Sequence, residues 1–280
     1  MPGTLYIVAT PIGNLEDMTF RAVRILKESA LIAAEDTRHS RKLLVHFGIT
    51  TPLTSYYDHN QALKGERILA TLLEGRQVAL ISDAGTPCIS DPGYQLVRDA
   101  LSAGITVVPI PGACAAIAAL SAAGLPTNAF TFAGFPPNKE GKRRSFLVSL
   151  ASAQGTVVLY EAPHRLKATL TDIAAVLGER RVVVARELTK LHEEFLQGTA
   201  STLQEQLPED RERGELVILI AAADEDSQRL EGPSPEEQLR TALAKGHSVK
   251  ETAALVAAAT GLPRRELYAQ ALIMKNKELV

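Results

Sequence analysis

Small, acidic and hydroxyl-bearing residues gather in four loops of this sequence, each of which follows a short apolar run. The loops are residues 10–14 (TPIGN), 35–38 (EDTR), 82–93 (SDAGTPCISDPG) and 111–116 (PGACAA). Loops after parallel strands meet at one edge of the sheet, where backbone amides and helix N-termini face a ligand. Small side chains such as Ala84, Gly85 and Ala115 let the backbone approach a flat molecule closely. Any one of the four is also an ordinary turn, but loop 82–93 is long, and long loops in compact domains tend to be functional.

The signatures of common nucleotide and metal sites are missing from these loops. Neither the GxGxxG spacing of dinucleotide-binding folds nor the phosphate-binding P-loop pattern occurs. Cys88 and Cys114 have no adjacent His or Asp partner, so both are expected to be packing residues rather than nucleophiles. No metal site is expected, because no ligand spacing relates His39, His46, His59, His192 and His247.

Short apolar runs alternate with helical patterns through the first half of the chain. Strands are predicted at residues 5–9, 31–34, 77–82 and 105–110, and helices at 20–27 and 113–123. Continuous apolar strands separated by helices are typical of a parallel sheet that is covered on both faces. Further strands are predicted at 130–133, 155–160, 181–185 and 215–221, with helices at 142–151 and 166–177. The predicted fold class is therefore α/β, with two α/β domains.

The domain boundaries follow changes in composition. The two α/β domains are predicted to cover residues 1–126 and 127–223. Residues 224–235 are polar and turn-rich, which is typical of a linker. Residues 236–280 are predicted to form a small helical module. Its helical patterns cover residues 236–245, 249–259 and 264–277.

The composition is that of a folded protein without a membrane segment. The 280 residues are 46% hydrophobic, which is ample for a core, and their formal charge of −2 argues against indiscriminate nucleic-acid binding. Residues 100–138 carry no charge, but prolines interrupt them and their longest smooth run, 113–123, has 11 residues. A spanning helix needs about 20. No secretory leader is recognisable at the N-terminus, so a cytoplasmic location is expected.

Several long motifs occur together and in order between residues 4 and 222. They are LYIVATPIGNL (5–15), AEDTR (34–38), SDAGTPCISDPG (82–93), PGACAAIAALSAAGLP (111–126), FAGFPP (132–137), YEAPHR (160–165), ARELTKLHEEFLQGT (185–199) and GELVILI (214–220). In these motifs the sequence resembles the tetrapyrrole methylase superfamily, and within it the ribosomal RNA small subunit methyltransferase I branch. The resemblance implies S-adenosylmethionine bound in a cleft between the two α/β domains. It also implies a homodimer that methylates the ribose 2′-oxygen of a cytidine in 16S rRNA of the small ribosomal subunit.

The resemblance also implies which residues contact the cofactor. In the first domain they are Pro11, Asp83, Ala84, Gly85, Thr86, Ile89, Cys114 and Ala115. In the second domain they are Glu161 and Thr189.

Methyl transfer from a sulfonium to a hydroxyl is an in-line displacement. It is helped by alignment of the reactants and by groups that favour the alkoxide. The predicted catalytic residues are Asp36, Arg38, Glu161 and Arg186, with His164, Glu187 and Lys190 as further polar candidates. Structural roles stay open for them, because Asp36 with Arg38 can cap a helix and Arg186 with Glu187 can form an ion pair. The sequence identifies no general base.

Two basic segments are candidates for contact with RNA. Lys139, Lys142, Arg143 and Arg144 lie together at the start of a predicted helix. Residues 248–272 read as a helix, a turn and a second helix that opens with two arginines, which resembles a helix-turn-helix module. The alternatives are a solvated helix face for the first segment and simple helix packing for the second.

Two other functions remain open from the sequence. The first is C-methylation of a tetrapyrrole precursor. Relatives with that activity carry a GxGxGxxxLT-type first loop and a Gly-Gly-Asp-Pro third loop, which TPIGNLEDMT (10–19) and AGTP (84–87) replace here. The second is a non-catalytic RNA-binding ribosome assembly factor that keeps the fold without turnover. Affinity for RNA distinguishes the first from the main hypothesis, and cofactor binding without methyl transfer would support the second.

Overall fold

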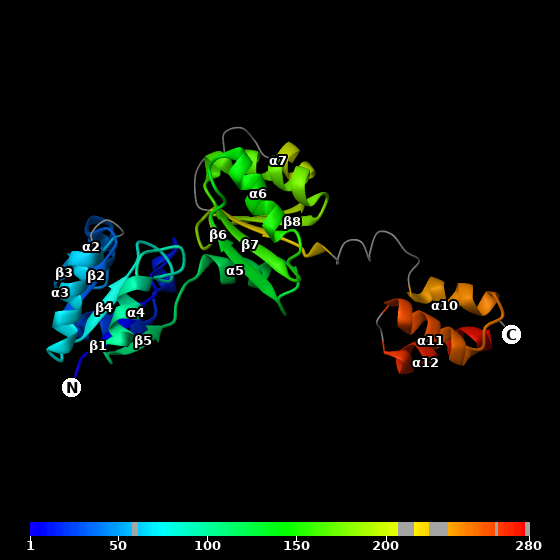
Figure 1. Cartoon of the computed structure of the whole chain (residues 1–280), viewed down its shortest axis with the longest axis horizontal. Helices are drawn as coiled ribbons and strands as arrows, with labels where there is room; N and C mark the ends of the chain where they lie inside the picture. Colours follow the sequence, from blue (N-terminus) through cyan, green and yellow to red (C-terminus); the bar gives the residue numbers. More distant parts are fainter. Residues whose placement is uncertain (58–60, 207–215, 224–234, 261–262, 278–280) are drawn as a thin grey trace. The chain divides into compact units, whose positions relative to one another are not determined.

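Short, strongly apolar segments form the first sheet. The computed structural model describes the chain except for residues 58–60, 207–215, 224–234, 261–262 and 278–280. The strands are β1 (Thr4–Val8), β2 (Leu31–Ala34), β3 (Leu53–Ser55), β4 (Val78–Ile81) and β5 (Thr106–Ile110). They pair in parallel in the order β3-β2-β4-β1-β5 (Figure 1). All four residues of β4 are buried, because this strand has a neighbour on each side and helices on both faces.

Four helices cover the two faces of this parallel sheet. They are α1 (Phe20–Glu28), α2 (Thr37–His46), α3 (Gln61–Leu73) and α4 (Tyr94–Ser102). On one face α1 and α2 bury Leu26 and Leu44 against the strands. On the other face α3 and α4 bury Leu72 and Leu96. Each helix therefore packs one apolar stripe on the sheet, and the carboxyl ends of the strands are left to the loops.

The second sheet is mixed. Its strands are β6 (Phe130–Gly134), β7 (Thr156–Glu161), β8 (Arg181–Arg186), β9 (Glu194–Thr199) and β10 (Leu216–Ile220), in the order β6-β7-β10-β8-β9. Only β6 and β7 run parallel, and the other pairs are antiparallel. Alternate residues of its strands point to opposite faces, so Leu159 and Ile218 join one apolar cluster while Val158 and Val217 join another.

Helices also cover both faces of the second sheet. α6 (Glu140–Leu150), α7 (Leu166–Leu177) and α8 (Ala200–Gln206) supply one apolar cluster. α5 (Ala115–Ala122) lies on the opposite face, where Ala119 and Leu120 pack among side chains of β7, β8 and β10 (Figure 1). The helix predicted at 113–123 is thus a core element, and it packs with the second sheet although it precedes the predicted boundary at residue 126.

The C-terminal helices form their own compact unit. The chain divides into Met1–Ala223 and Asp224–Val280. In the second unit α10 (Pro235–Ala244), α11 (Val249–Thr260) and α12 (Arg264–Lys277) bury Leu239, Val256 and Leu267 against one another. A capping box begins α11, because the Ser248 backbone N–H donates to Glu251 at 3.0 Å and the Glu251 N–H donates back to the Ser248 hydroxyl at 3.3 Å.

The predicted α/β fold class is confirmed, and each predicted strand and helix is present within a few residues. In the described part of the chain, the helices α2, α3, α4 and α8 and two strands were not predicted. β3 has only three residues, and none of the residues of β9 is fully buried, so neither shows a clear apolar run. No helix in the described part of the chain is long and apolar enough to cross a membrane.

Candidate active site

The loops that follow β1 and β4 are tied together. Thr10 and Gly85 exchange two backbone hydrogen bonds of 2.9 and 3.0 Å in an isolated antiparallel bridge. The Thr10 hydroxyl also donates to the Ser82 carbonyl at 3.2 Å. Gly85 has a φ of +79°, which a glycine adopts without strain. These contacts bring the predicted first and third loops into one structure.

Loop 82–93 is further fixed by its backbone and by one hydroxyl. Cys88 and Ser90 have φ values of +72° and +66°, a region that costs a residue with a side chain about 1–2 kcal/mol. The Thr86 hydroxyl donates to the Ala113 carbonyl at 3.1 Å, which holds the loop against the segment that enters α5. Burial, and secondarily the charge of Asp91, raise the pKa of the Cys88 thiol to about 11. The thiol is therefore protonated at neutral pH, as a packing residue should be.

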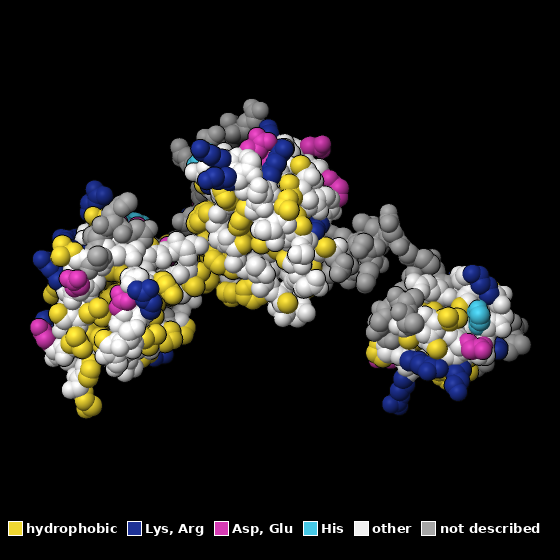
Figure 2. Space-filling view, in the orientation of Figure 1, with side chains coloured by type: hydrophobic (Ala, Val, Ile, Leu, Met, Phe, Trp, Pro, Cys, Tyr) yellow, Lys and Arg dark blue, Asp and Glu magenta, His cyan; other side chains and the backbone are white. Residues whose placement is uncertain are grey.

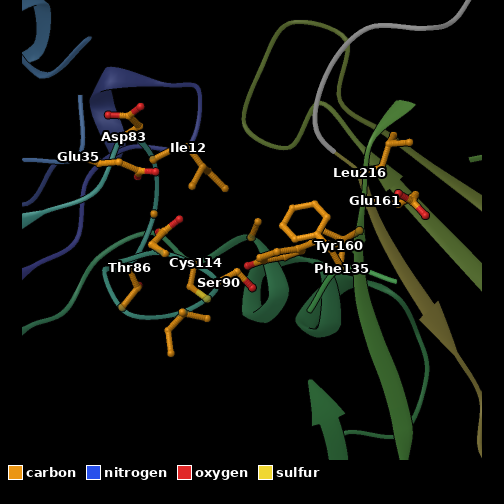
Figure 3. A pocket seen from close by; sticks show the side chains of 16 residues that line it. Ile12, Glu35, Asp83, Thr86, Ser90, Cys114, Phe135, Tyr160, Glu161 and Leu216 are labelled. Carbon is orange, nitrogen blue, oxygen red and sulfur yellow. The ribbon is translucent and has the colours of Figure 1, made fainter. Parts of the chain in front are cut away.

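A cavity of about 250 Å³ lies beside these loops (Figure 3). Its lining comes from the loops of the first sheet, from the start of α5 and from strands of the second sheet. Figure 3 shows Asp83 and Glu35 on one side and the rings of Tyr160 and Phe135 on the other. The predicted loops thus meet at a common cavity, together with groups from the second sheet.

Aromatic rings form the second-sheet side of the cavity. The Tyr160 ring lies edge-on to Phe132 at 4.8 Å between centroids and tilted against Phe135 at 5.5 Å. The Tyr160 hydroxyl accepts the Ala116 backbone N–H at 3.2 Å, so it caps α5, which has no side-chain cap of its own at Cys114. Burial raises the pKa of Tyr160, and Cys114 adds to this effect. The hydroxyl stays neutral and can hold both α5 and a ligand.

Glu161 is buried beside the cavity and is fully engaged by the protein. Its carboxylate accepts the Ala162 backbone N–H at 2.8 Å and the Thr169 hydroxyl, and it pairs with Arg165 at 3.2 Å. The side chain has no exposed surface. Arg165 in turn donates to the Pro136 carbonyl. Glu161 therefore fixes the segment after β6 rather than offering an open carboxylate.

The lining of the cavity is acidic. Glu35, Asp83 and Asp91 contribute carboxylates to it, while the charge of Glu161 is offset by Arg165, and none of the lining residues that the structure describes is lysine or arginine. Within the part of the chain that the structure describes, no cluster of three or more His, Cys, Asp or Glu could hold a metal ion. A cavity of this charge favours a cationic ligand over a phosphate-bearing one.

Most of the predicted cofactor residues line this cavity. Those that do are Asp83, Ala84, Gly85, Thr86, Ile89, Cys114, Ala115 and Glu161. Pro11 does not, although its neighbour Ile12 does and Thr10 pairs with Gly85. Thr189 also lies off it: its backbone, at φ +67°, donates to Glu193 at 2.6 Å. The residues on either side of Thr189 border a separate cavity of about 10 Å³.

The other predicted catalytic residues lie outside the lining. The Asp36 carboxylate caps α2 by accepting the Arg38 backbone N–H at 2.7 Å. This bond, followed by the Arg38 guanidinium, lowers the pKa of Asp36 below its ordinary value. Asp36 nevertheless touches the site, because its N–H donates to Asp83 at 3.0 Å. Arg38 is 91% exposed, and Arg186 pairs with Glu194 across β8 and β9 at 3.0 Å.

Sequence reasoning missed half of the lining. The missed residues are Ile12, Glu35, Ser90, Asp91, Phe135, Tyr160, Leu216 and Val217. All of them lie inside motifs already singled out, so membership of a motif was the available signal. Leu216 and Val217 are apolar residues at the start of a buried strand, and their residue types indicate core packing rather than a site.

Residues 4–204 match the family model for Tetrapyrrole (Corrin/Porphyrin) Methylases. The chain belongs to the tetrapyrrole methylase family. Residues 232–275 of this tetrapyrrole methylase match a second model, the RsmI C-terminal HTH domain.

Relatives place the chain within the family. It is 49% identical to "Ribosomal RNA small subunit methyltransferase I" of Pseudomonas aeruginosa, over 98% of this chain and 99% of that protein. It is 52% identical to the protein of the same name from Synechocystis, over 95% and 96%. A solved uroporphyrin-III C-methyl transferase from Thermus thermophilus, complexed with S-adenyl homocysteine, is 20% identical and superposes with a TM-score of 0.54, covering 78% of this chain and 97% of that one. The fold is thus that of the family, and the predicted branch is confirmed.

Proposed function

We propose that this tetrapyrrole methylase transfers a methyl group from S-adenosylmethionine to the ribose 2′-hydroxyl of a cytidine in 16S ribosomal RNA. The observation that carries the proposal is the acidic cavity at the carboxyl ends of β1 and β4, where loops of small residues meet. Its charge suits a sulfonium cation and opposes the phosphates of a nucleotide. The names of the relatives support ribosomal RNA as the substrate, and the resemblance of the motifs supports the ribose of a cytidine as the methylated group.

The residues at the cavity fit the cofactor chemically. Ala84, Gly85 and Ala115 carry little or no side chain, so backbone amides and carbonyls can contact an adenosine closely. Glu35 and Asp83 are carboxylates of the kind that accept hydrogen bonds from ribose hydroxyls. The cofactor contacts of Pro11 and Thr189, which lie off the lining, stay predictions.

S-adenosylmethionine, held by the small residues of the loops, would supply a sulfonium-bound methyl group. The ribose oxygen would form a bond to this carbon as the carbon–sulfur bond breaks, with the electron pair staying on sulfur and the hydroxyl proton passing to water. Asp36 has a pKa below its ordinary value, so it is a poor proton acceptor, and we assign it with Arg38 to orientation of the acceptor nucleotide. Glu161 and Arg186 are engaged in buried or half-buried pairs, and we assign them positioning roles. Much of the rate then comes from alignment.

The RNA side of the proposal rests on the C-terminal unit and on α6. In α12, Arg264 and Arg265 are exposed at the helix start. On α6 and its N-cap, Lys139 and Lys142 are exposed as well. Exposed cations of this kind contact phosphates. Because ribosomal RNA is the proposed substrate, we also propose that the protein acts in the cytoplasm on the small ribosomal subunit.

We further propose that the protein is a homodimer. The support in the structure is apolar side chains left on the surface of the first unit, including Ile117 on α5 at 50% exposure and Phe130 on the edge strand β6 at 44%. Measurement of the mass in solution by light scattering checks this proposal. A monomer at micromolar concentration would contradict it.

The experiment for the main proposal uses tritiated S-adenosylmethionine and small ribosomal subunits from cells that lack this activity. We expect one label per subunit at a ribose 2′-oxygen, located by nuclease digestion and mass spectrometry. Label on a base, or cofactor binding without transfer, would overturn the assignment. Uroporphyrinogen, offered as an alternative methyl acceptor, tests the tetrapyrrole function. Glu16→Gln is an exposed change outside the lining of the cavity, so it serves as the control variant that should methylate subunits as the wild type does.

A further inference from the structure

Phe135 is an apolar ring held at the mouth of the cavity. It follows β6 directly, lines the cavity, and is 54% exposed. Its ring rests against Tyr160 on one side (Figure 3). Single exposed apolar side chains are ordinary on protein surfaces, but this ring lines the cavity, so a ligand bound there would cover it.

The backbone on both sides of Phe135 is fixed. Gly134 has a φ of +67°, and a Cβ there would lie 3.5 Å from the Ser90 hydroxyl oxygen, so β6 ends in contact with loop 82–93. On the other side the Pro136 carbonyl accepts a hydrogen bond from Arg165, whose guanidinium is paired with the buried carboxylate of Glu161.

A second buried ion pair holds the same segment. The Arg143 guanidinium donates to the Asn138 carbonyl at 3.1 Å. Arg143 is almost fully buried and pairs with Asp172, which is also buried, at 2.6 Å. Two independent arginine–carboxylate pairs therefore fix the segment that carries Phe135. A binding surface prepared in this way loses little conformational freedom when the ligand arrives.

Charge changes sign along this segment. The cavity on one side of Phe135 is acidic, whereas Lys139 and Lys142, a few residues beyond it, are exposed cations. Figure 2 shows dark blue lysine and arginine side chains on the surface of this domain. An aromatic face between an acidic cavity and exposed cations suits a nucleotide of an RNA strand, since the base stacks on the ring and the phosphates meet the cations.

We propose that Phe135 is the stacking surface for the nucleobase of the RNA nucleotide whose ribose is methylated. The inference rests on the proposed function and adds a residue that determines how the acceptor is held. The base lies on the face of Phe135 that Tyr160 does not cover, and its ribose points into the cavity. Stacking on the ring replaces stacking on the neighbouring bases of the RNA, so the acceptor nucleotide is drawn out of its strand.

The test compares Phe135→Leu with Phe135→Trp. Phe20→Leu is the control, because it is the same substitution at an exposed phenylalanine that does not line the cavity. We expect kcat/KM for methylation of unmodified small subunits to fall about 10- to 100-fold in Phe135→Leu. Phe135→Trp should retain it, since indole stacks at least as well. Calorimetric affinity for S-adenosylhomocysteine should stay within about twofold of the wild type, as it involves no RNA base.

The possible outcomes separate the stacking role of Phe135 from the proposed methyltransferase function. If Phe135→Leu weakens cofactor binding as strongly as turnover, the ring contacts the cofactor and the inference is wrong. If Phe135→Leu behaves like Phe20→Leu, the stacking role is overturned while the methyltransferase stands. If the wild-type protein binds cofactor but methylates no subunit, the proposed function itself fails and the inference fails with it.

Discussion

The two sides of the cavity are built in different ways. The loop side, made of residues 82–93 with Cys114 and Ala115, presents mostly backbone and small side chains and depends on unusual φ values. The strand side, made of Phe135, Tyr160 and Glu161, presents large side chains held by hydrogen bonds and buried ion pairs. The loop side suits a ligand of constant shape, which a close-fitting backbone can recognise. The strand side suits an acceptor that is recognised by its rings and charges.

The largest expected effect is a loss of stability when the buried ion pair that holds the strand side is broken. Asp172→Ala leaves the buried Arg143 guanidinium without its carboxylate and also removes a 2.7 Å bond to Arg144. Breaking a buried pair by removing one partner costs about 3–5 kcal/mol, so the thermal midpoint should drop sharply. Glu140→Ala, which removes an exposed partner of Arg144, is the control and should barely shift the midpoint. Equal shifts for the two variants would contradict the structural role given to Asp172.

A smaller effect is expected where the strand side meets α5. Tyr160→Phe removes the acceptor of the Ala116 backbone N–H. A donor left unsatisfied in a partly buried place costs about 1–3 kcal/mol, and the start of α5 should loosen. Hydrogen exchange of the Ala116 amide, followed by mass spectrometry, measures this directly. Tyr94→Phe, at a site that is 70% exposed, should leave exchange and midpoint unchanged. Unchanged protection of Ala116 in Tyr160→Phe would show that another group caps the helix.

On the loop side, substitutions at two glycines distinguish the effect of backbone strain from the effect of contact with the ligand. Gly85→Ala and Gly48→Ala both force an alanine to a positive φ, of +79° and +60°, which costs each variant about 1–2 kcal/mol of stability. Only Gly85 lines the cavity, where an added Cβ would lie 3.4 Å from Ile12. Gly85→Ala should therefore bind S-adenosylhomocysteine several-fold more weakly in calorimetry, and Gly48→Ala should bind it normally. Similar losses of affinity in both would mean that strain, not contact, explains the effect.

The smallest effect concerns the half-buried Cys88 thiol of the loop side. The pKa of Cys88 is raised to about 11, above the value of the unfolded thiol near 8.5. The unfolded chain then releases this proton first as pH rises, so the contribution of this thiol to stability is constant below about pH 8 and declines up to about pH 11. Cys88→Ala should flatten this alkaline decline in the thermal midpoint relative to the wild type. The same slope between pH 8 and 11 in both proteins would contradict the raised pKa.

The sequence predicted the two sides of the cavity unequally. Ala84, Gly85 and Ala115 were found because close backbone approach leaves a mark in composition, namely small residues after an apolar run. Tyr160 and Phe135 leave no such mark. Tyr160 is one residue of a buried strand, and the place of Phe135 depends on Arg165, which is 29 residues away from the carbonyl that it holds. Such contacts are set by packing between distant segments, which no local pattern encodes.

The same limit applies to the charged residues that were chosen. Asp36, Glu161 and Arg186 follow or end strands, which is the right region for a site. Whether a carboxylate or guanidinium faces the cavity depends on its partners: Arg38 for Asp36, Thr169 and Arg165 for Glu161, and Glu194 for Arg186. Strand ends were predictable from apolar runs, whereas the pairings were not. The order of the strands in each sheet could not be predicted either, because β3 and β9 show no apolar run.

The arginines behind Phe135 bind main-chain carbonyls, those of Pro136 and Asn138, rather than side chains. These hydrogen bonds therefore do not depend on which side chains the segment carries. A change at position 135 or 138 alters what the surface recognises without altering where the surface stands. Selection, or an engineer, can retune acceptor preference at this segment by single substitutions while Glu161 and Asp172 preserve its position.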